Sequence, residues 1–351
     1  MNVLIPFLTF LLIGYFIPYF LPFSKKVQEN YTNVFCFFAF IVIVLLAAFR
    51  GESVGADTID YIDDYDDVKT MSFHDVAISY EGYLGYYYLS KIFAMWGAPI
   101  WLWFAFAELL FVSAIGRLIF SYSRERLYSV ILFVVLGHFL FSMAGMKQTM
   151  AMSLIIHSFL DLVGKKYLRS FLLIPIAYFF HPVVMIFVVA HLLFLLRNTK
   201  IFYPIALALP VIVAVGAMST LAFMVMVMDN SHFETYLEED NSYSSNTLIL
   251  YVMLLSCTLP CLPAYFRKNA MAKFELACLA LALAFQYLSS TVAPSIFRIG
   301  YMFTIFYFTF LPNAFAERKG LFIDILRVVA LMGAVFFFIW SNRGFVYTLM
   351  E

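Results

Sequence analysis

The chain has 351 residues, of which 64% are hydrophobic and only 13% are charged, and its formal net charge is zero. Soluble domains carry roughly 45–50% apolar and about 25% charged residues, so this composition excludes an ordinary soluble protein and indicates a polytopic membrane protein. All the cysteines lie in apolar stretches, so no disulfide framework is expected. They are Cys36, Cys257, Cys261 and Cys278.

Apolar stretches of helical length recur along the chain. The first of them, residues 2–23, has no basic start and no small-residue cleavage site, so we interpret it as a membrane span and not as a cleavable signal. The hydrophobic pattern predicts an all-α fold with about twelve membrane segments, some of them short or re-entrant. These segments are 2–23, 32–49, 99–120, 128–144, 149–163, 170–181, 182–196, 201–227, 247–266, 274–290, 298–316 and 321–341.

Two stretches allow a second interpretation. Residues 83–97 would form a helix of about 22 Å, which is shorter than the roughly 30 Å core of a bilayer. Tyrosines and Lys91 in this stretch suit a helix that lies at the outer interface. Residues 170–196 could form two short helices that meet at His181-Pro182, or one long helix that the proline kinks. If 83–97 spanned the membrane, the loops that follow it would change sides.

The segments that join the predicted spans alternate in charge. One set contains sixteen of the 22 Lys and Arg residues, and the positive-inside rule places that set in the cytoplasm. Both ends of the chain then lie outside, in the periplasm, together with two acidic outer loops, residues 50–98 and 228–246. Nothing in the sequence divides the chain, so we predict a single helical transmembrane domain over residues 1–351.

Three of the remaining cations lie at the mouths of predicted spans. Arg50 ends the second span, Lys147 lies between two spans, and Arg298 opens another. A charge within a span costs about 2.5–3.5 kcal/mol on insertion scales, so such residues usually face the bundle interior or an aqueous cavity. The three could be side chains that snorkel to the interface. They could instead form an anion site on the outer face, where arginine binds phosphate through paired hydrogen bonds.

Groups that could accept a proton lie on the same predicted face. Asp57 and Asp60 follow Gly55, which allows a tight turn that could aim the first carboxylate back at the membrane. Glu81 lies in the motif "YEGY". His181 lies at an outer turn, where it could be a general base, a phosphate contact or a helix-end residue bonded to the backbone.

Other polar residues receive a structural interpretation. The four acids within residues 63–67 are expected to form a solvated face, and the tyrosines within residues 80–88 are expected to form an interface belt. Glu108 is a mid-span acid that could pair with another helix. The sequence contains no phosphate-binding glycine loop, zinc motif or serine nucleophile elbow. We therefore expect no metal, no cofactor and no nucleic-acid partner.

Five motifs follow Arg50 in order along the chain: "VGADTIDY", "YEGY", "MKQTMAM", "FFHPVVMIF" and "FRIGYMF". This order resembles the EpsG-type, Wzy-like polysaccharide polymerases, over roughly residues 48–301. The resemblance implies a GT-C-like glycosyltransferase of the bacterial plasma (inner) membrane, acting in O-antigen, capsule or exopolysaccharide assembly. Such an enzyme would transfer a glycan from an undecaprenyl diphosphate-linked donor to a lipid-linked repeat-unit acceptor on the outer face of the membrane.

The residues and the resemblance together nominate a site. Asp57, Glu81 and His181 are the candidate catalytic groups. Lys147 stands where the family commonly has arginine, and lysine keeps the charge but lacks the bidentate fork. A chain-length regulator and a flippase are implied as partners, beside the lipid bilayer. The candidate residues for binding diphosphate or glycan are Arg50, Lys147, Arg298, Asp60, Tyr61 and Tyr301.

Two other functions fit parts of this pattern. A transporter or flippase for lipid-linked sugars would also have many spans, but such proteins often show paired repeats and polar groups at the midplane. No repeat is visible here, and the candidate residues gather on one face, which favours an enzyme. A glycan ligase or acyltransferase of the same pathway would use similar chemistry, and the sequence does not separate it from a polymerase.

Overall fold

The computed structural model describes residues 1–21, 23–216, 246–292 and 294–350. Within these ranges the secondary structure is helical, apart from one isolated bridge between Arg50 and Leu349. The predicted all-α class is therefore confirmed for this part of the chain. The second predicted acidic loop, residues 228–246, lies outside the described ranges except for its last residue.

The helices follow the apolar stretches of the sequence closely, and the stretch expected as a first outer loop is itself folded into three helices. The first half of the chain contains α1 (Leu4–Phe20), α2 (Lys25–Ala48), α3 (Thr58–Thr70), α4 (Phe73–Ser79), α5 (Leu84–Met95), α6 (Ile100–Tyr122), α7 (Arg126–Val135), α8 (His138–Ala144), α9 (Met146–Val163) and α10 (Tyr167–Phe180). The second half contains the 3₁₀ helix η1 (Pro182–Phe187), α11 (Val188–Leu196), α12 (Phe202–Val215), α15 (Asn246–Thr258), η2 (Leu259–Cys261), α16 (Leu262–Lys268), α17 (Ala272–Thr291), η3 (Pro294–Ile296), α18 (Phe297–Thr304), α19 (Tyr307–Ala316) and α20 (Leu321–Ser341).

Six helical stretches among the described residues are long and apolar enough to cross a bilayer, and the pair α7 and α8, bent by 49°, could form a seventh. Four apolar stretches are shorter: α1, α10, η1 with α11, and α12. The protein is thus a multi-pass membrane protein. The full count of twelve segments and the GT-C-like architecture stay predictions. The six candidate spans are Lys25–Ala48, Ile100–Tyr122, Asn246–Lys268, Ala272–Thr291, Phe297–Ala316 and Leu321–Ser341.

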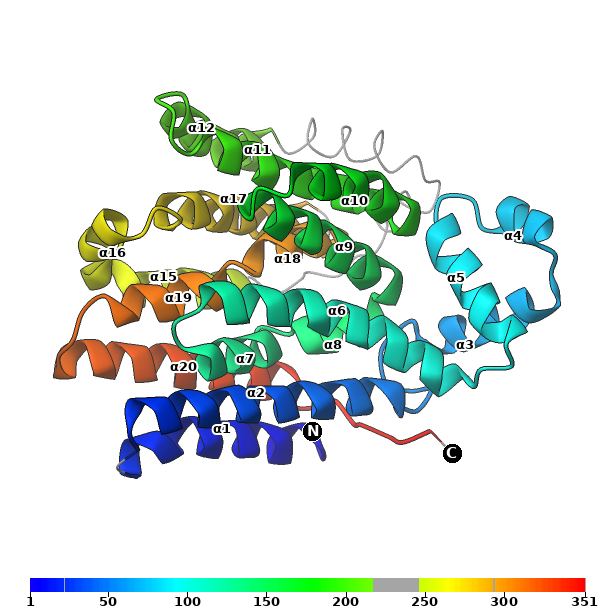
Figure 1. The fold of residues 1–351 in the computed structure, drawn as a ribbon, viewed down its shortest axis with the longest axis horizontal. Coiled ribbons are helices and arrows are strands. Elements are labelled where there is room, and N and C mark those ends of the chain that lie inside the picture. The colour runs from blue at the N-terminus through cyan, green and yellow to red at the C-terminus, as the bar shows by residue number, and fades with distance from the viewer. Residues whose placement is uncertain (22, 217–245, 293, 351) are drawn as a thin grey trace.

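The long helices lie roughly along one direction, and α3, α4 and α5 gather beyond one end of them, drawn in light blue to cyan in Figure 1. Both ends of this chain reach that same end of the bundle. Asn2 exchanges hydrogen bonds with the backbone of Tyr347, at 2.8 and 3.0 Å, and the Gly51 N–H donates to the Thr348 carbonyl at 2.8 Å. The common placement of the two ends matches the predicted topology, whereas the side of the membrane that they face stays a prediction.

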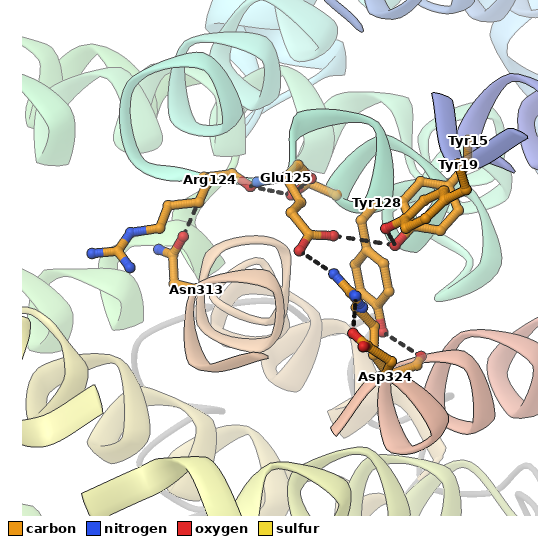
Figure 2. Close-up of polar contacts among 10 residues, drawn as sticks. Tyr15, Tyr19, Arg124, Glu125, Tyr128, Asn313 and Asp324 are labelled. Atoms are coloured by element: carbon orange, nitrogen blue, oxygen red, sulfur yellow. Dashed lines mark hydrogen bonds and ion pairs between the residues drawn. The ribbon is translucent and has the colours of Figure 1, made fainter. Parts of the chain in front are cut away.

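The opposite end of the bundle is closed by a polar network at the start of α7, shown in Figure 2. The Glu125 carboxylate accepts a hydrogen bond from Arg327 of α20 at 2.6 Å and from the Tyr15 hydroxyl of α1 at 3.1 Å. The Arg124 N–H donates to the Asn313 side chain of α19 at 2.9 Å. These contacts compensate the carboxylate and join four helices at the end where the basic connections lie.

The chain reverses direction at His181, so residues 170–196 form two short helices. In α9 the Ser158 hydroxyl donates to the carbonyl of Ser170, near the start of α10, at 2.7 Å. The same hydroxyl lies 3.0 Å from the Nε2 atom of His191 in α11. Because one hydroxyl touches both helices at the same level, the segment after His181 runs back along α10. The proline that follows ends the first helix instead of kinking a continuous one.

The helix α5 packs within the α3–α5 group, in agreement with the interfacial interpretation of residues 83–97. Its Lys91 side chain is 4% exposed, and the ammonium donates to the Val68 carbonyl at 3.0 Å and to the Met71 carbonyl. These carbonyls belong to the last turn of α3 and the residue that follows it, where a helix presents unpaired acceptors and partial negative charge. Lys91 therefore caps α3 from α5.

We expect Lys91→Met to loosen the α3–α5 group, because it leaves two carbonyls without their charged donor. The free energy of local opening should fall by about 1–3 kcal/mol, seen as faster hydrogen exchange in peptides from these helices. Lys69→Met is the matched control, because Lys69 is an exposed lysine on α3, the helix that Lys91 caps. Its expected change is within about 0.5 kcal/mol. Equal exchange rates in wild type and Lys91→Met would contradict the capping role.

Candidate functional site

A cavity of about 520 Å³ lies where the α3–α5 group meets the ends of α9, α10 and α18. Its volume is within the range of about 300–1,000 Å³ that is usual for ligand sites. Seven of the nine candidate site residues line it, and Arg50 and Tyr301 do not. The lining residues are Asp57, Asp60, Tyr61, Ser79, Tyr80, Glu81, Tyr83, Tyr87, Gly145, Lys147, Gln148, His181, Val183, Ser295, Arg298 and Ile299.

The first wall is built by the start of α3. Gly55 has a φ of +92°, and a Cβ there would lie 2.9 Å from the Met143 carbonyl, so only glycine lets the turn approach α8 this closely. The turn delivers Asp57, the residue just before α3, to the cavity, with exposed Asp60 one turn further on. Burial raises the pKa of the Asp57 carboxyl, while the positive charge of Arg298 partly opposes this increase. Asp57 is therefore half-buried beside a cation.

Tyr61 joins α3 to the break between α8 and α9. Its hydroxyl donates to the Ala144 carbonyl at 2.9 Å and accepts from the Met146 N–H at 3.0 Å. These two backbone groups flank Gly145, where the helical bonding is interrupted. The hydroxyl thus satisfies polar groups exposed by the break and fixes the first turn of α9. Lys147 lies in that turn.

The Lys147 ammonium is held by one carboxylate and a ring of tyrosines. It bonds to Asp64 at 3.1 Å and to the Tyr87 hydroxyl, which itself donates to Asp64 at 2.8 Å. It also lies 4.5 to 5.6 Å from four ring centroids, a range in which cation–π attraction is significant. Lys147 is therefore a compensated, well-oriented cation. The four rings belong to Tyr61, Tyr83, Tyr86 and Tyr87.

Arg298 supplies the second cation of the cavity. It lies in the first turn of α18, directly after the 3₁₀ turn η3. Its backbone carbonyl accepts a hydrogen bond at 2.8 Å from Nε2 of Gln148, one residue beyond Lys147. The starts of α9 and α18 are therefore joined, and both deliver a positive side chain to one cavity. The charge of Arg298 acts on the titration of both Asp57 and His181.

His181 is the single residue between α10 and η1. Its backbone is extended, and it is 8% exposed. Its Nδ1 atom accepts the Val183 N–H at 3.3 Å, so the neutral ring carries its proton on Nε2. Burial, with added repulsion from Arg298 and Lys147, lowers the pKa of the imidazole to about 3. The ring is therefore neutral near pH 7 and offers the cavity an N–H donor. This geometry favours the phosphate-contact hypothesis for His181 over the general-base hypothesis.

The remaining wall comes from the turn between α4 and α5. Glu81 is exposed there, next to Gly82, which has a φ of +95°. The rings of Tyr80 and Tyr87 are stacked, with centroids 3.8 Å apart, and the Tyr83 ring lies 5.1 Å from the His181 ring. This wall thus combines aromatic faces with a carboxylate, and its Tyr83 and Tyr87 rings also lie against the Lys147 ammonium.

Arg50 is not part of the cavity lining. Its side chain is 1% exposed and the guanidinium lies 3.8 Å from the ring centroid of Phe104 in α6. It donates to the Ala47 carbonyl at 2.8 Å and to the Thr58 hydroxyl at 3.1 Å. The structure therefore does not bring Arg50 into the cavity with Lys147 and Arg298, because its donors are directed into the protein; a role for Arg50 in substrate binding stays a prediction.

Tyr301 also lies away from the cavity. Its hydroxyl donates to the Leu136 carbonyl at 2.9 Å, and its ring stacks on His138 at 4.6 Å. The hydroxyl binds at the break between α7 and α8, next to Gly137, which has a φ of +83°. Tyr301 thus packs at that break, outside the cavity lining, and its glycan contact stays a prediction.

Several residues that build the site are not among the candidates nominated from the sequence. Asp64 is expected on a solvated face, yet it is the carboxylate partner of Lys147. Its spacing held a signal, since Asp57, Tyr61 and Asp64 recur at the intervals of one helix face. Tyr87 was assigned to an interface belt, and Gln148 was not considered. No local pattern marks Gln148, because its role depends on how α9 meets α18.

The arrangement can hold an anion and take up a proton in one enclosed space. Two cations from α9 and α18 line the same cavity as the carboxylates of Asp57 and Asp60 and the neutral imidazole of His181. Such groups stabilise negative charge that develops on a leaving group and accept a proton from an attacking hydroxyl. Among the described residues, no group of three or more His, Cys, Asp or Glu has an arrangement that could hold a metal ion.

Comparison with known proteins gives one assignment. Searches of curated proteins and of solved structures find no significant match to the chain. A family model described as "EpsG family" matches residues 33–348, a range that includes every residue of the cavity. Because the match covers most of the chain, the protein belongs to the EpsG family.

Proposed function

We propose that this protein is a polysaccharide polymerase that transfers a glycan from an undecaprenyl diphosphate-linked donor to a lipid-linked repeat-unit acceptor. Membership of the EpsG family supports a polymerase-type glycosyltransferase. The observation that carries the finer proposal is the single cavity that Lys147, Arg298 and Asp57 line together, with both positive charges acting on the Asp57 carboxyl. A diphosphate leaving group needs cations, and an attacking sugar hydroxyl needs a base.

The cations are proposed to bind the donor diphosphate. Arg298 offers a planar fork that suits phosphate oxygens, and Lys147 adds a second positive charge from the facing helix. His181 lines the same cavity, near enough to both cations for their charges to lower its pKa, and its Nε2–H is proposed to donate to a phosphate oxygen. Since these three groups supply positive charge and donors, the proposed reaction needs no metal ion.

Asp57 is proposed to be the general base. The acceptor hydroxyl gives its proton to the Asp57 carboxylate while its oxygen bonds to the anomeric carbon of the donor. The bond from that carbon to the diphosphate oxygen breaks, and its electron pair leaves with the diphosphate. Arg298 and Lys147 then stabilise the negative charge that builds up on the leaving group. Burial of Asp57 supports this assignment, because a raised pKa makes the carboxylate a better proton acceptor.

The wall formed by the α4–α5 turn is proposed to hold the acceptor sugars. Tyr80 and Tyr83 present aromatic faces to the cavity, and Glu81 can accept hydrogen bonds from sugar hydroxyls. The proposed site opens on the outer face of the bacterial plasma membrane, as the positive-inside rule predicts. Both chain ends would then be periplasmic, and a flippase and a chain-length regulator are the proposed partners.

Deletion of the gene is expected to leave single repeat units where long glycan chains stood, because elongation is lost while unit synthesis continues. Gel analysis of surface polysaccharide measures this directly. Complementation with wild type should restore long chains, whereas Arg298→Ala should not. Arg343→Ala is the matched control, an exposed arginine near the same end of the bundle, and should restore them.

Each alternative outcome identifies a different function. Repeat units trapped on the inner face would indicate a flippase, and free polymer that lacks its final attachment would indicate a ligase. Unchanged long chains in the deletion strain would refute the polymerase proposal. Loss of elongation by the purified protein in EDTA would contradict metal independence.

The proposed base predicts a pH dependence of the elongation rate. Asp57 acts as a base only while ionised, and its pKa is raised, so the rate should fall with decreasing pH at values above the ordinary aspartate pKa of about 3.9. Asp57→Asn should lower the rate by roughly 10²–10⁴-fold and remove this fall of the rate at low pH, the acid limb of the pH profile. His181→Gln should leave the limb in place, because the low pKa of His181 keeps its ring neutral across that range. An acid limb that survives in Asp57→Asn would exclude Asp57 as the base.

A further inference from the structure

The turn that carries Asp57 is held from two sides by groups outside the cavity. One side is Arg50, which is buried between the turn and the bundle. Besides its bonds to Ala47 and Thr58, its guanidinium approaches the Met146 sulfur at 4.0 Å. Thr58 is 0% exposed and follows Asp57 directly, and its hydroxyl also donates to the Val54 carbonyl. Arg50 therefore fixes the residue next to Asp57.

The burial of Arg50 is compensated within the bundle. Its charge interacts with Glu108 of α6, which is 3% exposed, and its face lies on the Phe104 ring. A buried guanidinium with these contacts costs much less than an isolated buried charge. It links the end of α2, the start of α3, α6 and the start of α9. These contacts within the protein explain why an arginine can be buried at this position, without a bound ligand to compensate its charge.

The other side of the turn is covered by residues 345–350. The Arg50–Leu349 bridge includes the Gly51 N–H donating to the Thr348 carbonyl at 2.8 Å and the Met350 N–H donating to the Phe49 carbonyl at 3.0 Å. The hydroxyls of Ser53 and Thr348 lie 2.9 Å apart.

Segment 345–350 is itself anchored to the bundle. Tyr347 is 3% exposed, and its hydroxyl donates to the Leu46 carbonyl in α2. The chain therefore closes over the Asp57 turn with a segment that lies nearly 300 residues further along the sequence.

Gly51 shows how closely this segment approaches. A Cβ at Gly51 would overlap the Thr348 hydroxyl and lie 3.0 Å from the Leu349 carbonyl. Gly51 and Gly55 therefore allow the turn to be enclosed on both sides, by residues 345–350 and by α8. The turn has little room to relax unless one of these neighbours moves.

We propose that Arg50 and segment 345–350 form a brace that positions Asp57 in the cavity. This proposal rests on the function assigned above to Asp57. Neither part of the brace lines the cavity, so both act through the turn and are positioning groups. Lys147 and Arg298 lie on α9 and α18, whereas the bonds of segment 345–350 described above go to the end of α2 and to residues 49–53.

Two changes to the brace test the proposal in the purified protein, with lipid-linked repeat units extracted from the deletion strain as substrate. One ends the chain after Asn342, and the other is Gly51→Ala. Each should lower kcat by roughly 10–100-fold, since a displacement of about 1 Å can cost 10²-fold. The KM for the donor should change little, because its proposed cations are untouched. Val346→Ala, at an exposed position of the same segment, is the control with wild-type kinetics.

A double-mutant comparison separates positioning from general stability. In the Asp57→Asn background the same two changes should lower the residual rate by no more than about twofold, because the group that they position is already gone. Adding Thr348→Gly to Gly51→Ala should recover most of the lost rate by relieving the overlap. The brace would be overturned if the two changes lowered the rate equally in the wild-type and Asp57→Asn backgrounds. Unchanged kcat in both brace variants, or no recovery of the rate on adding Thr348→Gly, would also overturn it. A wild-type rate in Asp57→Asn alone would instead refute the proposed base.

Discussion

A lysine ammonium at the start of a helix within a mostly apolar bundle must be compensated where it lies, and the way Lys147 is compensated organises the whole site. Its carboxylate comes from Asp64 on α3, its hydroxyl from Tyr87 on α5, and its aromatic neighbours from both. One charge therefore binds the α3–α5 group to the bundle. The cavity exists because this attachment leaves a space beside it, between the start of α3 and the start of α18.

The two sides of the cavity have different structural origins. The cations belong to the bundle, at the starts of α9 and α18, which Gln148 joins directly. The carboxylates and the aromatic wall belong to the α3–α5 group beyond the helix ends. We infer that a lipid-linked diphosphate and the acceptor sugars would meet at this boundary, where apolar helices give way to polar side chains. The position of a base on the α3–α5 group, relative to the cations of the bundle, then depends on how firmly that group is attached to the bundle.

Most of the helix positions could be predicted from the sequence. Long apolar stretches and the distribution of Lys and Arg between them can be recognised from the local composition of each segment, without knowledge of how the helices pack. The same topology brought Asp57, Glu81, Lys147, His181 and Arg298 to one end, and all five line the cavity. The direction in which each polar side chain points from its helix could not be predicted in this way. Arg50 and Lys147 both lie at helix mouths, but the guanidinium points inward to Thr58 and the ammonium lines the cavity. The bond from Val183 to Nδ1 of His181, which decides the tautomer, also has no sequence signal.

Binding of undecaprenyl diphosphate to the purified protein tests the central claim most directly, because it separates diphosphate recognition from the later chemistry. The account predicts that Arg298→Ala weakens the affinity by roughly 10–100-fold, as expected for a lost charge-assisted hydrogen bond. Lys147→Ala should also weaken binding, whereas Asp57→Asn and the control Lys69→Ala should bind at least as tightly as wild type. An unchanged dissociation constant in both Arg298→Ala and Lys147→Ala would contradict the proposed diphosphate site.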